Sequence, residues 1–274
     1  MHQHPYSIFL NGNSISIENA KEQLEQKEAT LAFHGFGQHA GVFKRISAQE
    51  KNTVFFCFDL FFHGKSKEIK FSEAYDIEIF VNEIDFFLQY HSIQRFNLLA
   101  FSIGARPCLA IAQNFNNRID NLQLIAPDGI YENPWYHFAT RIALGRLSFK
   151  VLARNEDLLR ASIERSLVMT NGRLKLFKLA LKVLNEHSTT KVYHTWLTYS
   201  NFRFDAKKII RQLQAKDAQV KVVLSNNDHV IKAGKVRKKL NACGEIFITV
   251  NYEHEKILQK LVKIGFFEKD KATS

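Results

Sequence analysis

A chain of 274 residues with 46% hydrophobic content can bury one large core, which excludes disordered and fibrous proteins. No segment approaches the roughly 18 consecutive apolar residues of a membrane-spanning helix, and the first residues lack the basic and apolar regions of a signal peptide, so we expect a cytoplasmic protein. The net charge of +11 suits an acidic protein, an anionic membrane or a nucleic acid as partner.

The early part of the chain alternates between short, mostly apolar runs and helical patterns. Asn11-Gly12 between two extended runs predicts a hairpin at the start. Later apolar runs are typical of strands that are buried on both faces. These predicted strands are Thr30–Phe33, Thr53–Phe58, Phe96–Phe101, Asn121–Ile125, Val220–Leu224 and Glu245–Val250. Helical spacing between them, as from about Ser72 to Tyr90, predicts a doubly wound, mostly parallel sheet whose ligand sites lie at the carboxyl ends of the strands.

Residues 131–204 interrupt this alternation with helical patterns alone. Between Tyr131 and Arg203 there are 12 Lys or Arg against 5 Asp or Glu, a net charge of 12 − 5 = +7. We therefore predict a core of residues 1–130 and 205–274 with a helical cap inserted at 131–204. The clearest helix, Gly172–Asn185, has a cationic face that is either solvated or docks on an anionic membrane or an acidic partner. The segment contains no nucleic-acid-binding motif, so we expect no nucleic-acid partner.

The three cysteines, Cys57, Cys108 and Cys243, are odd in number and widely separated. This spacing indicates neither a disulfide framework nor a metal-binding knuckle. We expect the three thiols to be buried as small apolar side chains, and we predict no metal and no cofactor.

Three polar residues follow the ends of predicted strands in a chemically useful order. Ser102 follows one strand, Asp228 a later one and His254 the last, while the small residues Ala100 and Gly104 allow a sharp turn at Ser102. A serine hydroxyl needs a neutral imidazole to accept its proton, and the imidazole needs a carboxylate on its other nitrogen. We therefore predict Ser102 as nucleophile, His254 as general base and acid, and Asp228 as the residue that orients His254.

Each of these assignments has an alternative. Ser102 could simply cap the helix that follows it. His229 competes as the base, although it follows Asp228 directly and so does not occupy a separate strand end. Asp128, in the turn Pro127-Asp128-Gly129, is the alternative acid.

Four motifs in this order resemble the alpha/beta-hydrolase superfamily over nearly the whole chain. His34-Gly35-Phe36-Gly37 looks like the oxyanion loop, Asp59–Ser66 looks like the D-x-x-x-H-G-x-S segment, and Ala100–Gly104 looks like the nucleophile elbow. The order serine, aspartate, histidine is that of the family's triad. The resemblance implies the alpha/beta-hydrolase fold with a helical cap. It also implies that the backbone N–H groups of Phe36 and Ile103 hold a developing oxyanion.

Several residues depart from the family pattern. Ala100 replaces the first glycine of the elbow, and Phe61 and Phe62 replace the proline and glycine usual before His63. Ser225 stands where a glycine often precedes the acid loop. None of these changes removes a group needed for catalysis, and we expect His63, like His34, to shape a loop.

The sequence therefore predicts a serine hydrolase that cleaves a small-molecule carboxylic ester or thioester through an acyl-enzyme. An acidic acyl carrier or coenzyme A, attracted by the basic cap, would deliver the acyl group. Three alternatives stay open: carbon–carbon bond hydrolysis on the same triad, an interfacial lipase with Gly172–Asn185 as its lid, and a catalytically inactive hydrolase fold that serves as a binding protein. A serine at position 102 argues against haloalkane dehalogenases and epoxide hydrolases, which need a carboxylate there.

Overall fold

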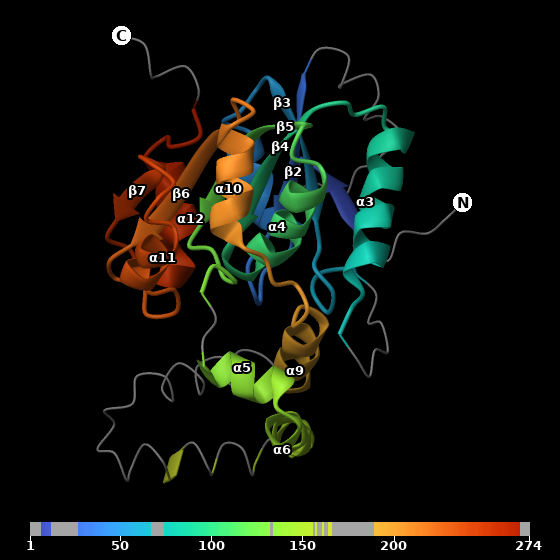
Figure 1. Cartoon of the computed structure of the whole chain (residues 1–274), viewed down its shortest axis with the longest axis vertical. Helices are drawn as coiled ribbons and strands as arrows, with labels where there is room; N and C mark the ends of the chain where they lie inside the picture. The colour runs from blue at the N-terminus through green and yellow to red at the C-terminus, as the bar shows by residue number, and fades with distance from the viewer. Residues whose placement is uncertain are drawn as a thin grey trace. The chain divides into compact units, whose positions relative to one another are not determined.

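The chain forms two compact units (Figure 1). The structure is a computed structural model that describes residues 7–11, 27–66, 74–131, 134–155, 157, 161, 164–165 and 189–268. The first unit comprises Met1–Ile69, Asp76–Tyr131 and Phe202–Ser274, and the second comprises Lys70–Tyr75 and Glu132–Asn201. The second unit spans nearly the interval predicted as an insertion and adds residues 70–75, where the Tyr75 N–H donates to the Thr198 carbonyl oxygen at 3.0 Å.

A seven-stranded sheet lies at the centre of the first unit, with strand order β1-β3-β2-β4-β5-β6-β7. The strands are β1 (Ile8–Leu10), β2 (Glu28–Phe33), β3 (Thr53–Phe58), β4 (Phe96–Phe101), β5 (Ile119–Ile125), β6 (Gln219–Ser225) and β7 (Phe247–Val250). Neighbouring strands are parallel except for β1, which is antiparallel to β3. The predicted doubly wound, mostly parallel sheet is therefore confirmed.

Helices cover the sheet because its central strands are apolar on both faces. Every residue of β3 and β4 is buried. Three helices lie side by side on one face of the sheet: α3 (Ile77–Tyr90), α4 (Ala105–Asn114) and α10 (Ala206–Gln214) (Figure 1). The shorter helices of this unit are η2 (Ala40–Phe43), α2 (Lys44–Ser47), η3 (Ser102–Gly104), α11 (Ala233–Lys239), η4 (His254–Lys256) and α12 (Ile257–Lys263). In the described part of the chain, no helix combines the length and the apolarity needed to cross a bilayer.

Local polar groups adjust two of the predicted boundaries. Helix α3 begins at Ile77 rather than near Ser72 because the Asp76 carboxylate caps it, accepting a 2.7 Å hydrogen bond from the Glu78 N–H. Asn11, at a φ of 51°, exchanges hydrogen bonds with the Phe55 backbone and so ends the pairing of β1 with β3. The second strand of the predicted hairpin, residues 15–17, lies outside the described residues.

The second unit is mainly helical in its described residues. Its helices are α5 (Pro134–Arg141), α6 (Ala143–Arg154) and α9 (Thr189–Thr198). Helix α6 crosses α5 so closely that a Cβ at Gly145 would lie 2.1 Å from the Phe138 carbonyl oxygen. The Phe149 ring packs on the rings of Tyr193 and Trp196 at 5.3 and 5.5 Å between centroids. The predicted helix Gly172–Asn185 lies outside the described residues.

The three cysteines form no disulfide and all are buried, as predicted. Cys108 lies in α4 and is fully shielded from solvent. Burial raises the pKa of the Cys108 thiol far above its usual value, because the thiolate would lose its hydration. Burial also raises the pKa of Cys243. The folded protein therefore holds these groups in the neutral thiol form.

We expect the buried Cys108 thiol to make stability fall at alkaline pH. Its stabilising contribution is complete below the unfolded pKa of about 8.5 and is lost above it, because only the unfolded chain can ionise the thiol. The free energy of unfolding should fall by up to about 1.4 kcal/mol per pH unit from this group. Guanidinium unfolding between pH 7 and 10 should give a shallower pH slope for Cys108→Ala than for the wild type, and equal slopes would contradict the prediction.

Candidate active site

Ser102 lies on a strained turn between β4 and α4. Its φ is 52°, in the left-handed region that residues other than glycine rarely adopt. The turn passes so close to β2 that a Cβ at Gly104 would lie 2.3 Å from the Phe33 carbonyl oxygen. The Asp128 N–H donates to the Ser102 carbonyl oxygen at 3.0 Å and holds the turn from the other side. Ala100, which replaces the usual glycine, pairs regularly with both neighbouring strands, so its methyl group does not disturb the strand.

The structure brings Ser102, His254 and Asp228 together in one hydrogen-bonded chain. The distance from Ser102 Oγ to His254 Nε2 is 2.9 Å, and the distance from His254 Nδ1 to Asp228 Oδ2 is 2.6 Å. Because an ionised carboxylate can only accept, Nδ1 carries the imidazole proton and Nε2 accepts the serine hydroxyl. This is the tautomer that can take a proton from Ser102.

Burial and backbone donors keep the Asp228 carboxylate in place. The side chain of Asp228 is 1% exposed, whereas that of His254 is 14% exposed. The second carboxylate oxygen, Oδ1, accepts the Val230 and Ile231 N–H groups at 2.7 and 2.8 Å. One oxygen is thus held by the backbone while the other faces the imidazole.

The two alternative residues do not occupy the positions of Asp228 and His254. His229 is exposed at the surface. Asp128 binds the buried Arg106, with 2.6 Å between Arg106 Nε and Asp128 Oδ2. Its carboxylate therefore neutralises a buried guanidinium, and the geometry favours Asp228 as the acid beside His254.

Ser225 joins the loop that carries Asp228 to the loop that carries His254. Its hydroxyl donates to the Tyr252 carbonyl oxygen and accepts the Tyr252 N–H at 2.9 Å. It also accepts the Asn227 N–H at 3.3 Å. Because β6 and β7 are neighbours with Ser225 opposite Val250, the side chain continues their pairing beyond the end of the strand. The departure from glycine noted in the sequence thus has a structural role that the sequence did not reveal.

Two asparagines strengthen the same link between the loops. Asn226 Nδ2 donates to Asn251 Oδ1 and Asn227 Nδ2 donates to the Asn251 carbonyl oxygen, both at 3.0 Å. The Phe101 ring stacks on the His254 ring with 5.0 Å between centroids and 27° between planes. Sequence reasoning missed these contacts, although the run Ser225-Asn226-Asn227 was a visible concentration of short polar side chains.

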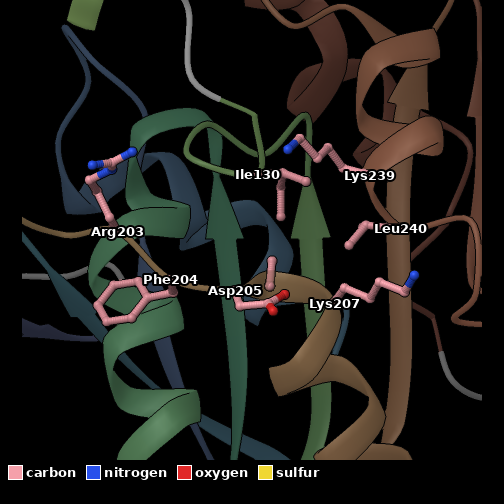
Figure 2. Close-up of a pocket in the computed structure, with 8 residues that line it drawn as sticks. Ile130, Arg203, Phe204, Asp205, Lys207, Lys239 and Leu240 are labelled. Carbon is pink, nitrogen blue, oxygen red and sulfur yellow. The ribbon is translucent and has the colours of Figure 1, made fainter.

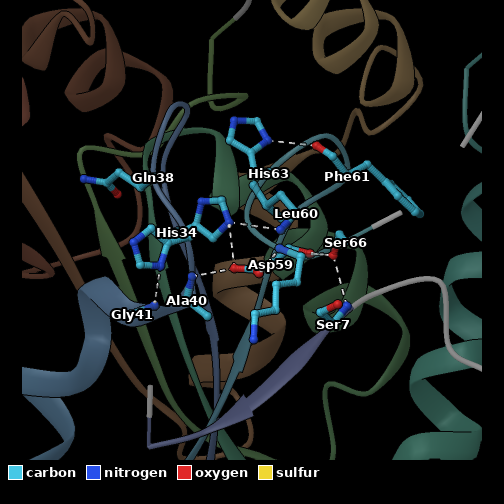
Figure 3. Close-up of polar contacts among 12 residues, drawn as sticks. Ser7, His34, Gln38, Ala40, Gly41, Asp59, Leu60, Phe61, His63 and Ser66 are labelled. Carbon is cyan, nitrogen blue, oxygen red and sulfur yellow. Dashed lines mark hydrogen bonds and ion pairs between the residues drawn. The ribbon is translucent and has the colours of Figure 1, made fainter. Parts of the chain in front are cut away.

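The imidazoles of His34 and His63 lie near each other (Figure 3) and hold the loop that contains Phe36. His34 Nε2 accepts the Leu60 N–H at 3.0 Å, so its Nδ1 carries the proton and donates to the Gly35 carbonyl oxygen at 2.7 Å. His63 Nε2 likewise accepts the Gly37 N–H at 3.0 Å. Its Nδ1 donates to the Phe61 carbonyl oxygen at 2.8 Å. Both imidazoles bridge backbone groups, as predicted.

Asp59 explains the spacing of the D-x-x-x-H-G-x-S segment (Figure 3). Its carboxylate accepts the Ala40 N–H at 2.6 Å and the Lys65 N–H at 2.7 Å. A Cβ at Gly64 would lie 1.9 Å from Asp59 Oδ2, and Gly64 has a φ of 55°, so glycine is required there. Phe62 has a φ of 63°, which explains why a glycine is usual at its position.

The two N–H groups predicted to hold an oxyanion lie on the turn at Ser102 and on the loop held by His34 and His63. Ile103 is the second residue of η3, so its N–H precedes the first N–H that the helix itself can bond. Phe36 lies in the loop held by His34 and His63, and its ring meets the His63 ring edge-on at 5.2 Å between centroids. The oxyanion role of Phe36 and Ile103 stays a prediction.

A separate hollow of about 500 Å³ lies beside the start of α10 (Figure 2). Its lining includes Ile130, Asp205 and three cationic residues, Arg203, Lys207 and Lys239. None of its lining residues is Ser102, Asp228 or His254, and we assign it no part in the chemistry.

Comparison with known proteins adds the family relationship. A family model for the alpha/beta hydrolase fold matches residues 31–242. An esterase from Thermogutta terrifontis is similar in structure, with a TM-score of 0.62, 12% identity, and coverage of 95% of this chain and 90% of that one. The enol-lactonase from Burkholderia xenovorans LB400 is also similar, with a TM-score of 0.60, 15% identity, and coverage of 95% of this chain and 94% of that one. The thioesterase domain from the curacin biosynthetic pathway has a TM-score of 0.57 and 13% identity, with coverage of 88% of this chain and 92% of that one.

A comparison with curated protein sequences found no match. At identities of 12 to 15%, the structural likeness establishes the fold and nothing finer. The chemistry depends instead on the residues at the site of this chain.

We expect Ser225→Ala to loosen the contact between Asp228 and His254. The 2.6 Å hydrogen bond should give a strongly downfield proton NMR resonance for His254 Nδ1–H, identified by its loss in His254→Ala. In Ser225→Ala this resonance should shift upfield or broaden through faster exchange. Ser47→Ala removes a serine hydroxyl bound to the Asn11 carbonyl oxygen and should leave the resonance in place. An unchanged resonance in Ser225→Ala would show that the hydroxyl does not position the pair.

Proposed function

The chain belongs to the alpha/beta hydrolase fold family, and on that premise we propose that it is a serine hydrolase of carboxylic esters or thioesters. The observation that carries the proposal is the hydrogen-bonded chain from Ser102 through His254 to Asp228. A serine hydroxyl bound to a correctly protonated imidazole, which a buried carboxylate orients, is an activated nucleophile.

In the proposed first half-reaction, Ser102 Oγ attacks the acyl carbon and His254 Nε2 takes the hydroxyl proton. The carbonyl π electrons move to its oxygen, and the N–H groups of Phe36 and Ile103 would stabilise this oxyanion. When the intermediate collapses, the bond to the leaving alcohol or thiol breaks, and His254 gives that group its proton. Asp228 stays ionised and stabilises the imidazolium.

In the second half-reaction, water attacks the acyl-enzyme. His254 Nε2 accepts a proton from the water, the acyl–Ser102 bond breaks, and the proton returns to Ser102 Oγ. The products are a carboxylic acid and the free enzyme, so atoms and charge balance without an oxidant or a cofactor. The stacked Phe101 ring would keep the imidazole plane fixed through both proton transfers.

The choice of esters or thioesters rests on the nucleophile and on the neighbouring folds. Similar structures are an esterase, an enol-lactonase and a thioesterase domain, which supports acyl transfer from oxygen or sulfur leaving groups. The net charge of +7 between Tyr131 and Arg203 would attract an anionic leaving group, such as coenzyme A or an acidic acyl carrier. Carbon–carbon bond hydrolysis needs the same triad, and a substrate panel that includes a diketone separates it from ester cleavage.

We expect a fluorophosphonate probe to label Ser102 covalently and an activated short-chain ester to give a burst of product. Both results follow from an activated nucleophile that forms an acyl-enzyme. Ser102→Ala should abolish the labelling and the burst, whereas Ser47→Ala, which removes an unrelated hydroxyl, should retain both. Failure of the folded wild-type protein to react would favour the inactive binding protein instead.

The two aspartates near the site should give opposite results when each is changed to asparagine. Asp228→Asn should lower kcat by about 10⁴ because the amide favours the wrong imidazole tautomer. Asp128→Asn should keep kcat within about tenfold of the wild type but lower the free energy of unfolding by about 3 kcal/mol, because it removes the Asp128 carboxylate that binds the buried guanidinium of Arg106. Ester hydrolysis and urea unfolding of both variants test this. The reverse pattern would make Asp128 the functional acid.

A further inference from the structure

Helix α6 of the second unit exposes a stripe of large apolar side chains. Leu144, Leu147 and Val151 are 69, 60 and 47% exposed, and Ile142 just before the helix is 45% exposed. Positions 144, 147 and 151 are separated by three and four residues, so they share one face of the helix. Contiguous exposed apolar side chains of this size indicate an interaction surface, unlike apolar side chains scattered singly.

The opposite face of α6 already has its packing partners. Gly145 lies against the backbone of α5, and Phe149 packs on the Tyr193 and Trp196 rings of α9. Gly145 and Phe149 are four residues apart and so define the inward face. The exposed stripe is therefore a second apolar face that the packing of the described helices does not use.

Positive charge adjoins this stripe. Residues 134–155 contain four Lys or Arg and no Asp or Glu. Arg146 and Lys150 are exposed and lie four residues apart, next to the apolar stripe. In the described part of the chain, neither of them forms an ion pair. Apolar side chains flanked by exposed cations suit the surface of an anionic bilayer, which has an apolar interior under a layer of anionic headgroups.

Helix α3 shows that apolar exposure alone does not define such a surface. Its Ile79, Phe86 and Tyr90 are 52, 45 and 57% exposed. However, α3 also carries three acidic residues, Glu78, Glu83 and Asp85, where residues 134–155 have none. The two helices are comparable in apolar exposure and opposite in charge, so α3 provides an internal control.

We propose that the face formed by Ile142, Leu144, Leu147 and Val151, together with Arg146 and Lys150, docks on an anionic lipid bilayer; we call it the α6 face. The apolar side chains enter the boundary between headgroups and acyl chains, and the cations contact lipid phosphates. A second copy of the chain is a poorer occupant, because two α6 faces would bring cations together without any acidic group between them. This inference does not depend on the chemistry at Ser102.

The test is co-sedimentation of the whole protein with phosphatidylcholine vesicles that contain or lack phosphatidylglycerol. The wild type should bind the anionic vesicles at least about tenfold more tightly than the neutral ones, and added salt should weaken this binding. Arg146→Gln and Lys150→Gln should each weaken it about fivefold, from about 1 kcal/mol per cation. Leu144→Ser with Leu147→Ser should weaken binding at least about tenfold although every charge is kept.

The matched control is Ile79→Ser with Phe86→Ser on α3, which removes as many exposed apolar side chains and should leave vesicle binding unchanged. Each variant is also measured without vesicles. Light scattering tests whether a second copy of the chain covers the α6 face, and thermal unfolding tests whether another part of the same chain covers it. The proposal is overturned if wild-type binding does not depend on phosphatidylglycerol, or if the Leu144 and Leu147 changes leave it intact. It is also overturned if those changes instead dissociate an oligomer, or lower Tm as they would if another part of this chain covered the face.

Discussion

The site depends on one backbone constraint, the left-handed conformation of Ser102 at the end of β4. This conformation costs about 1 to 3 kcal/mol for a residue with a side chain, so the surrounding structure must enforce it. Gly104 does so by passing so close to the Phe33 carbonyl oxygen that no side chain fits between them. The strain turns the hydroxyl toward His254 and sets Ile103 at the start of the helix, where its N–H has no intrahelical acceptor. The strained backbone at Ser102 thus positions both the nucleophile and an N–H donor.

The acid and the base depend instead on a link between two loops. In a parallel sheet the backbone pairing stops where the strands end, and loops beyond that edge have no shared ladder to hold them. Here the Ser225 hydroxyl acts toward the Tyr252 backbone as donor and acceptor together, as a strand backbone would. Asn226 and Asn227 add contacts to Asn251. Short polar side chains therefore set the separation of Asp228 and His254 where strand pairing cannot.

The sequence predicted the fold well because the strands of a parallel sheet are nearly continuous apolar runs. β3 and β4 have the predicted bounds, and β2, β5, β6 and β7 differ from theirs by only one or two residues at an end. Chain order, together with the resemblance to the alpha/beta-hydrolase motifs, predicted which three polar residues meet, since the carboxyl ends of parallel strands share one edge. Contacts between distant side chains, such as Arg106 with Asp128 and Phe101 with His254, left no periodic signal. The beginning of α3 was missed because the Asp76 cap outweighs the helical pattern that precedes it.

The charged groups near the triad and the excess of cations proposed for docking lie in different parts of the sequence. The ionised groups at the site are compensated locally: Asp228 by His254 and two backbone donors, and Asp128 by Arg106. The excess of cations lies largely between Tyr131 and Arg203, in a part of the sequence that contributes none of Ser102, Asp228 and His254. Salt screens exposed charges strongly, whereas it screens buried pairs much less. A salt-sensitive docking surface can therefore change with little effect on the triad, whose electrostatics are buried and local.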